Sequence, residues 1–108
     1  MASSDLIKHF TDENFQKEIG KGVTLVDFYA IWCGPCRMLS PIIEDVAKHF
    51  EGKAKIGKVD IDSEQKIAAL FQVTSVPTLI LFKDGKEINR LIGLRDMEAI
   101  KEFILSVL

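Results

Sequence analysis

The chain has 108 residues and a mass of 12.1 kDa, and its 14 basic and 16 acidic residues give a formal net charge of −2. This length is typical of one domain, and we expect residues 1–108 to form it. An apolar fraction of 47% and a charged fraction of 28% exclude a disordered or low-complexity chain. Lys and Arg are not clustered as nucleic-acid or membrane-surface contacts require, so we expect neither partner.

The sequence also lacks the signals of insertion or export. No apolar run approaches the roughly 18 residues that span a bilayer. Residues 1–5 are small and polar, without the basic and apolar regions of a signal peptide. We therefore expect a cytoplasmic monomer in a reducing compartment.

Hydrophobic periodicity, caps and turn residues predict nine elements. Thr11, Ser63 and Asp96 are candidate N-caps, and Asp84-Gly85 is a two-residue hairpin signal. The predicted strands cover 6–10, 23–30, 55–61, 78–83 and 86–92, and the predicted helices cover about 11–19, 34–50, 63–71 and 96–107.

The element order is therefore β-α-β-α-β-α-β-β-α. Helices join the first three strands, so these strands should be parallel, and the last hairpin should add an antiparallel edge. The fold class is α/β, with one central mixed sheet and helices on both faces. Pro41 falls inside the long helix, where it loses the hydrogen bond to the Arg37 carbonyl and predicts a kink.

Two cysteines, Cys33 and Cys36, stand where the second strand passes into the long helix. A structural zinc site or an iron–sulfur cluster needs four ligands, and the two histidines do not complete such a set, so we expect no metal. Residues three apart on a helix share a face, so a disulfide and a dithiol can both be accommodated. A bond closing so short a loop would stabilise the fold by only about 2 kcal/mol, which favours reversible redox chemistry over a structural role.

The helix N-terminus favours a thiolate at Cys33, whereas Cys36 lies one turn inside. The expected division is an exposed nucleophile and a shielded resolving thiol. The alternatives are two ordinary thiols or half of an intermolecular metal site.

Two charged residues interrupt apolar strands. Asp27 is either a buried proton acceptor for Cys36 or an aspartate at a strand bulge facing water. Lys58, in the neighbouring strand, either pairs with Asp27 across the sheet or extends to solvent as a surface lysine. Trp32 is either part of the core or an exposed contact for a partner, and Val76-Pro77 is either cis or trans.

The sequence resembles the thioredoxin family over nearly its whole length. The strongest matches are Asp27-Phe28-Tyr29-Ala30 and Trp32-Cys33-Gly34-Pro35-Cys36, and further matches are Lys58, Asp60, Asp62, Val76-Pro77-Thr78, Phe82-Lys83-Asp84-Gly85 and Gly93. A reactive Cys-x-x-Cys pair is typical of this family.

The resemblance implies the thioredoxin fold and a protein-disulfide oxidoreductase that acts through Cys33 as nucleophile and Cys36 as resolving thiol. It implies that Asp27 deprotonates Cys36, that Gly34, Pro35 and Lys58 tune the redox pair, and that Pro77 is a cis-proline facing the cysteines. The substrate groove would consist of Trp32, Ser75, Val76, Pro77 and Gly93.

The expected partners are disulfide-containing proteins as substrates and a thioredoxin reductase as electron donor. We expect no bound cofactor, because the chain has no flavin or nicotinamide motif. A disulfide oxidant or isomerase on the same fold is an alternative, although Gly34-Pro35 offers no titratable group to stabilise the reduced form. A binding subunit with incidental thiols is another alternative.

Overall fold

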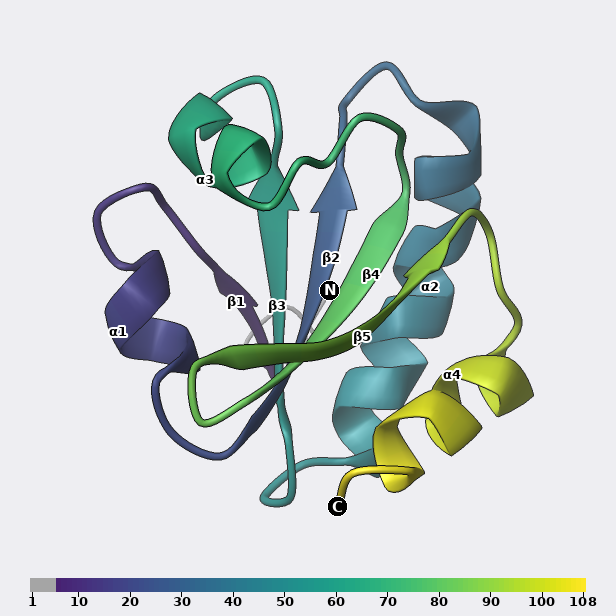
Figure 1. The fold of residues 1–108 in the computed structure, drawn as a ribbon. Helices are drawn as coiled ribbons and strands as arrows, with labels where there is room; N and C mark the ends of the chain where they lie inside the picture. Colours follow the sequence, from purple (N-terminus) through teal and green to yellow (C-terminus); the bar gives the residue numbers. More distant parts are fainter. Residues whose placement is uncertain (1–5) are drawn as a thin grey trace.

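A computed structural model describes residues 6–108, so the expectation about residues 1–5 lies outside the described range. It contains five strands and four helices in the predicted order (Figure 1). The elements are β1 (Ile7–His9), α1 (Phe15–Ile19), β2 (Val23–Tyr29), α2 (Gly34–His49), β3 (Lys55–Asp60), α3 (Gln65–Leu70), β4 (Thr78–Lys83), β5 (Lys86–Ile92) and α4 (Met97–Leu105).

The strands form one mixed sheet in the order β1-β3-β2-β4-β5. β1, β3 and β2 are parallel, whereas β4 runs antiparallel to β2 and β5 runs antiparallel to β4. The predicted α/β fold class is confirmed, with the hairpin as one edge of the sheet. Asp84 and Gly85 both have positive φ, 50° and 86°, as a tight two-residue turn requires.

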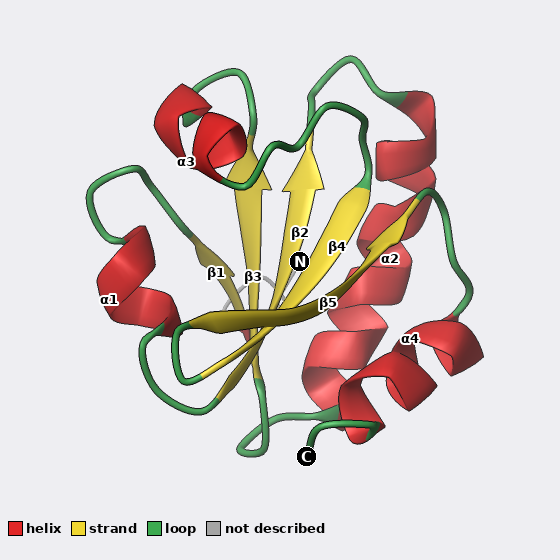
Figure 2. Cartoon of the chain, in the orientation of Figure 1, coloured by secondary structure: helices red, strands yellow, loops and turns green. Residues whose placement is uncertain are grey.

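Helices cover both faces of the sheet, as Figure 2 shows. α2 and α4 pack on one face and α1 and α3 on the other. Side chains of β2 alternate between these layers: Leu25 packs in the α2 layer, and Val26 and Phe28 pack in the α1 layer. Asp27 therefore belongs to the α2 face.

Two predicted caps are wrong. α1 begins at Phe15 after Asn14, because Thr11 closes a preceding turn with Asn14 through hydrogen bonds of 2.8 and 3.1 Å. α3 begins after Glu64, and Ser63 makes only a 3.4 Å bond to the Asp60 carbonyl. The predicted Asp96 cap is confirmed, since its carboxylate accepts a hydrogen bond from the Ala99 amide at 2.9 Å.

Candidate redox site

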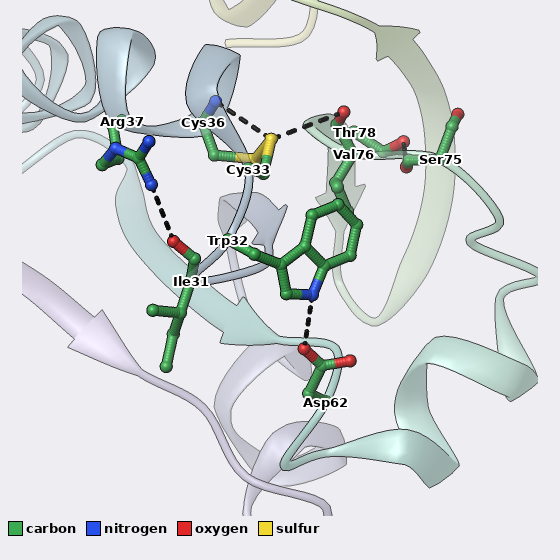
Figure 3. Close-up of a disulfide and its surroundings, with 9 residues drawn as sticks. All are labelled: Ile31, Trp32, Cys33, Cys36, Arg37, Asp62, Ser75, Val76 and Thr78. Atoms are coloured by element: carbon green, nitrogen blue, oxygen red, sulfur yellow. Dashed lines mark hydrogen bonds between the residues drawn. A yellow bond between two sulfur atoms is a disulfide. The ribbon is translucent and has the colours of Figure 1, made fainter.

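The two cysteines form a disulfide at the start of α2, with their Cα atoms 5.2 Å apart (Figure 3). Cys33 is the N-cap of the helix, and its sulfur accepts a hydrogen bond from the Cys36 amide at 3.1 Å. Pro35 occupies the first turn, where its missing N–H costs nothing. A sulfur at the N-cap that accepts a hydrogen bond from an amide of the first helical turn is well placed to carry negative charge after reduction.

The expected contrast in exposure between the cysteines is not seen in the disulfide form. Cys33 is 4% exposed and Cys36 is 5% exposed. Both lie in a small buried cluster with Ala30, against which Tyr29, Ile61 and Val76 pack. A difference in reactivity must therefore come from their electrostatic surroundings or from the reduced state.

Asp27 lies at the centre of the sheet and is 1% exposed. Its backbone pairs with Lys58 on β3 and Leu79 on β4, so the alternative of a bulge facing water is wrong. Neither carboxylate oxygen has a hydrogen-bond partner among residues 6–108. Burial raises the pKa of Asp27 from 3.8 to about 7, and the positive charge of Lys58 opposes that rise.

Lys58 neither pairs directly with Asp27 nor extends freely into solvent. Its ammonium donates a hydrogen bond to the Ser40 hydroxyl at 3.0 Å and lies 5.4 Å from the centre of the Tyr29 ring. The two β-strand neighbours thus share a face without forming an ion pair in the described part of the chain. Sequence analysis missed Ser40, because a lone serine within a helix gives no local signal of such a contact.

A pocket of about 240 Å³ lies beside Cys36 and is lined by residues of β2, the loop that follows it, α2 and β3. We call it the Cys36 pocket. Two of its lining residues are joined by a hydrogen bond, which the Arg37 guanidinium donates to the Ile31 carbonyl at 3.0 Å (Figure 3). The pocket is lined by Tyr29, Ala30, Ile31, Cys36, Arg37, Ser40 and Lys58.

The predicted groove residues meet on the other side of the disulfide. The Val76-Pro77 bond is cis, and the Cys33 sulfur lies 3.8 Å from the Val76 carbonyl oxygen. The Gly93 amide donates a hydrogen bond to the Pro77 carbonyl at 2.8 Å. Gly93 has a φ of 99°, a backbone conformation that residues with a side chain rarely adopt. The structure therefore brings two separate loops to the edge of the redox pair.

Trp32 borders the same edge and is 67% exposed, so it is not part of the core. Its indole N–H donates to Asp62 at 2.9 Å, which holds the ring against the loop after β3. Ile92 and Leu94, on either side of Gly93, also expose apolar surface. An exposed apolar rim around a disulfide suits contact with another polypeptide.

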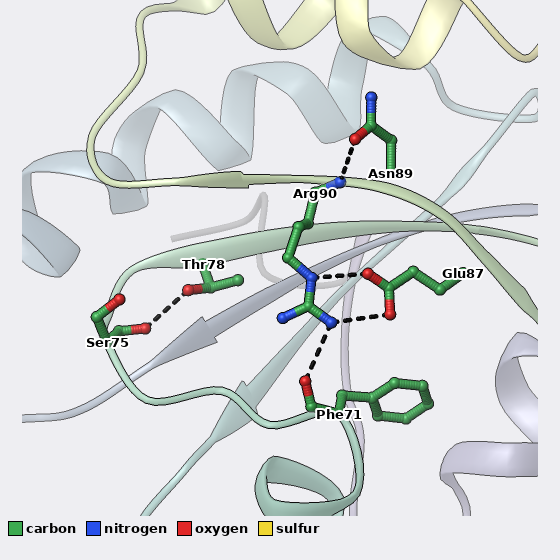
Figure 4. Close-up of polar contacts among 6 residues, drawn as sticks. All are labelled: Phe71, Ser75, Thr78, Glu87, Asn89 and Arg90. Atoms are coloured by element: carbon green, nitrogen blue, oxygen red, sulfur yellow. Dashed lines mark hydrogen bonds and ion pairs between the residues drawn. The ribbon is translucent and has the colours of Figure 1, made fainter.

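Polar contacts fix the loop that carries Ser75 and Pro77 (Figure 4). The Thr78 hydroxyl donates to the Ser75 carbonyl at 2.7 Å. Arg90 on β5 donates to the Phe71 carbonyl at 3.0 Å and forms an ion pair with Glu87 at 2.7 Å. These bonds tie both ends of the loop to the sheet.

A closed CXXC pair at a helix N-terminus, beside a cis-proline loop, defines a thiol–disulfide exchange protein on an α/β fold. The family model described as Thioredoxin matches residues 6–106. The chain is 48% identical to a thioredoxin of Chlamydia pneumoniae over 103 residues, which are 95% of this chain and 96% of that protein.

It is also 48% identical to a thioredoxin of Staphylococcus saprophyticus over 94 residues, which are 87% of this chain and 90% of the relative. A Staphylococcus aureus thioredoxin is 45% identical with the same coverage. The chain belongs to the thioredoxin family and is a protein-disulfide oxidoreductase, a thiol–disulfide reductase. No helix within residues 6–108 has the length and apolarity needed to cross a membrane.

Proposed function

We propose that the chain is a general reductant of protein disulfides in which Cys33 attacks, Cys36 resolves and Asp27 accepts the proton of Cys36. The position of Cys33 carries this proposal, because its sulfur already faces the amide of Cys36 at the helix N-terminus. That amide and the helix dipole stabilise a thiolate there. Gly34 and Pro35 keep the intervening turn free of titratable groups.

The reaction starts from the reduced dithiol. The Cys33 thiolate attacks one sulfur of the substrate disulfide, and the other substrate sulfur leaves as a thiolate. Asp27 then takes the proton of Cys36, and the Cys36 thiolate attacks the Cys33 sulfur. This step closes the Cys33–Cys36 disulfide and releases the second substrate thiolate, so two electrons pass from the dithiol to the substrate.

Burial makes Asp27 a suitable acceptor in this second step. Its pKa of about 7 lies far closer to that of a thiol than the pKa of an exposed aspartate does. The carboxylate has no competing hydrogen bond from residues 6–108. Lys58 reduces the cost of the negative charge from across the sheet.

Substrate polypeptides would lie across Trp32, Ser75, Val76, Pro77 and Gly93. The exposed indole and the apolar residues beside Gly93 supply contact area next to the Cys33 sulfur. A thioredoxin reductase would return two electrons to the disulfide, as family membership suggests. We also propose that residues 1–108 act as a single-domain monomer in the cytoplasm, where reducing conditions favour the dithiol form.

Single-turnover kinetics test the assignment of the three roles. The reduced protein is mixed rapidly with an excess of a disulfide-bonded peptide, and the mixed disulfide is followed by acid quenching and mass spectrometry. We expect Cys36→Ser to accumulate the mixed disulfide at Cys33. Asp27→Asn should slow its resolution by at least tenfold near pH 7 while attack changes less. Normal resolution in Asp27→Asn would refute the proton-acceptor role.

The reduction potential of the Cys33–Cys36 pair separates a reductant from an oxidant. A strongly reducing value of about −270 mV fits the proposal, whereas a value of about −120 mV indicates an oxidant. Equilibration with glutathione or dithiothreitol, read by alkylation and mass shift, gives this value.

A further inference from the structure

Ser40 contacts the charged group that acts on Asp27. Its hydroxyl accepts the 3.0 Å hydrogen bond from Lys58, and it lies on α2 one turn after Cys36. Ser40, Cys36 and Lys58 all line the Cys36 pocket. Ser40 on α2 thus holds the end of the Lys58 side chain, which extends from β3.

We propose that Ser40 is a positioning residue whose hydroxyl holds the Lys58 ammonium inside the Cys36 pocket and thereby favours ionisation of Asp27. This inference rests on the proposed role of Asp27 as the proton acceptor of Cys36. Within residues 6–108, Ser40 makes no hydrogen bond to the reacting sulfurs or to the carboxylate, so it acts through Lys58.

Among the groups around Asp27, Lys58 is the cation whose position Ser40 can change. β3 places Lys58 in register with Asp27, and β4 places the apolar Leu79 there. α2 brings Cys36 and Ser40, which carry no charge in the disulfide form. Tyr29, on the same strand and two residues further on, contributes a phenol that is neutral near pH 7, and Asp60 on β3 lies in register with it. Arg37 on α2 lines the same pocket but donates to the Ile31 carbonyl. The charge that acts on Asp27 is that of Lys58, so the position of its ammonium matters most.

Removal of the hydroxyl leaves Lys58 with the Tyr29 ring as its remaining described contact at the ammonium. The pocket is bordered by Ile31, which is 72% exposed, so solvent is within reach. A lysine ammonium without a partner moves toward water. Moving a unit charge from about 6 to about 8 Å, at an effective dielectric constant of about 20, raises the midpoint of carboxylate titration by about half a pH unit.

The test is the titration of the Asp27 carboxyl carbon by NMR in the oxidised full-length protein. We expect Ser40→Ala to raise its midpoint by about half a pH unit, for the charge displacement given above. Ser40→Thr keeps a hydroxyl and should restore the wild-type midpoint. In a Lys58→Met background, Ser40→Ala should have no further effect, because the cation that it positions is gone.

An unchanged or lowered midpoint in Ser40→Ala would overturn the proposal, as would an equal rise in the Lys58→Met background. The titration needs no turnover, so it is separate from the test of the proposed function. The pH profile of mixed-disulfide resolution should move in the same direction as the NMR midpoint. Normal resolution in Asp27→Asn would instead remove the acceptor role, whatever the midpoint in Ser40→Ala.

Discussion

The carboxylate of Asp12 accepts a hydrogen bond at 3.0 Å from the backbone amide of Ile67, which lies 55 residues later in the chain. Ile67 is in the first turn of α3, where amides have no partner within the helix. The Asp12 amide in turn donates to the Glu64 side chain at 2.9 Å. The loop between β1 and α1 therefore caps α3, the helix that follows β3.

Asp12→Ala should lower the free energy of unfolding by about 1 kcal/mol, because it leaves an N-terminal amide of α3 without its acceptor. Asp12→Asn keeps an acceptor oxygen and should cost less. Ser63→Ala is the matched control and should have little effect, since Ser63 does not cap the helix. Urea unfolding of the three variants measures this, and an equal loss in Ser63→Ala would contradict the assignment.

The two wrong caps show why part of the fold escapes sequence analysis. Ser63 is a suitable cap residue, but a local pattern does not reveal that Asp12, 55 residues before Ile67, supplies the acceptor for α3. The error at Thr11 is local, because its reciprocal hydrogen bonds with Asn14 close a turn before the helix begins. The β4–β5 hairpin and the Asp96 cap are predicted correctly because their determinants are adjacent in sequence. Long-range partners depend on packing, which the sequence does not display.

In the redox site, too, local features could be predicted from the sequence and contacts between distant elements could not. The spacing of Cys33 and Cys36 and the strand-to-helix transition point directly to a closable pair. Helical periodicity places Met38 on the apolar stripe of α2, yet it is 63% exposed, whereas the adjacent Leu39 is fully buried, so the stripe is narrower than the apolar pattern indicates. The contact of Ser40 with Lys58 joins a helix to a strand and leaves no periodic trace.

Cys33 should be alkylated at least tenfold faster than Cys36 in the native reduced protein. The two residues are almost equally buried in the disulfide form, so the expected preference comes from the thiolate that the Cys36 amide and the helix N-terminus stabilise. Brief treatment with iodoacetamide followed by peptide mass spectrometry measures it. The Cys33→Ser variant gives the rate of Cys36 alone, and faster labelling of Cys36 would reverse the two roles.

Pro41→Ala should change the free energy of unfolding by less than about 1 kcal/mol. The new amide can donate to the Arg37 carbonyl, which adds about 1 kcal/mol, and the more flexible unfolded chain offsets that gain by a similar amount. α2 already continues through Pro41 from Gly34 to His49, so the helix does not depend on the proline. Chemical unfolding measures the balance, and a loss above about 2 kcal/mol would show that core packing requires the proline.

Asp27 should make the protein less stable as the pH rises from about 4 to about 7. Its pKa is near 3.8 when the chain is unfolded and about 7 in the fold, so the native state binds more protons over that interval. Below the pKa of the unfolded chain, Asp27 is protonated in both states and its burial costs no charge desolvation. That advantage is lost as the pH rises through the pKa of the folded state. A difference of about 3 pH units corresponds to roughly 4 kcal/mol.

Asp27→Ala removes this penalty but leaves a small cavity, which costs about 1–2 kcal/mol in a packed core. At pH 8 the variant should therefore be about 2 kcal/mol more stable than the wild type, and near pH 4 it should be less stable. Its unfolding free energy should also depend less on pH between 4 and 7. Guanidinium unfolding at pH 4, 6 and 8 measures both proteins, with Asp27→Asn as the control that nearly preserves volume. A wild-type advantage that persists at pH 8 against both variants would mean that the ionised carboxylate is stabilised by the fold, contrary to its unpartnered burial.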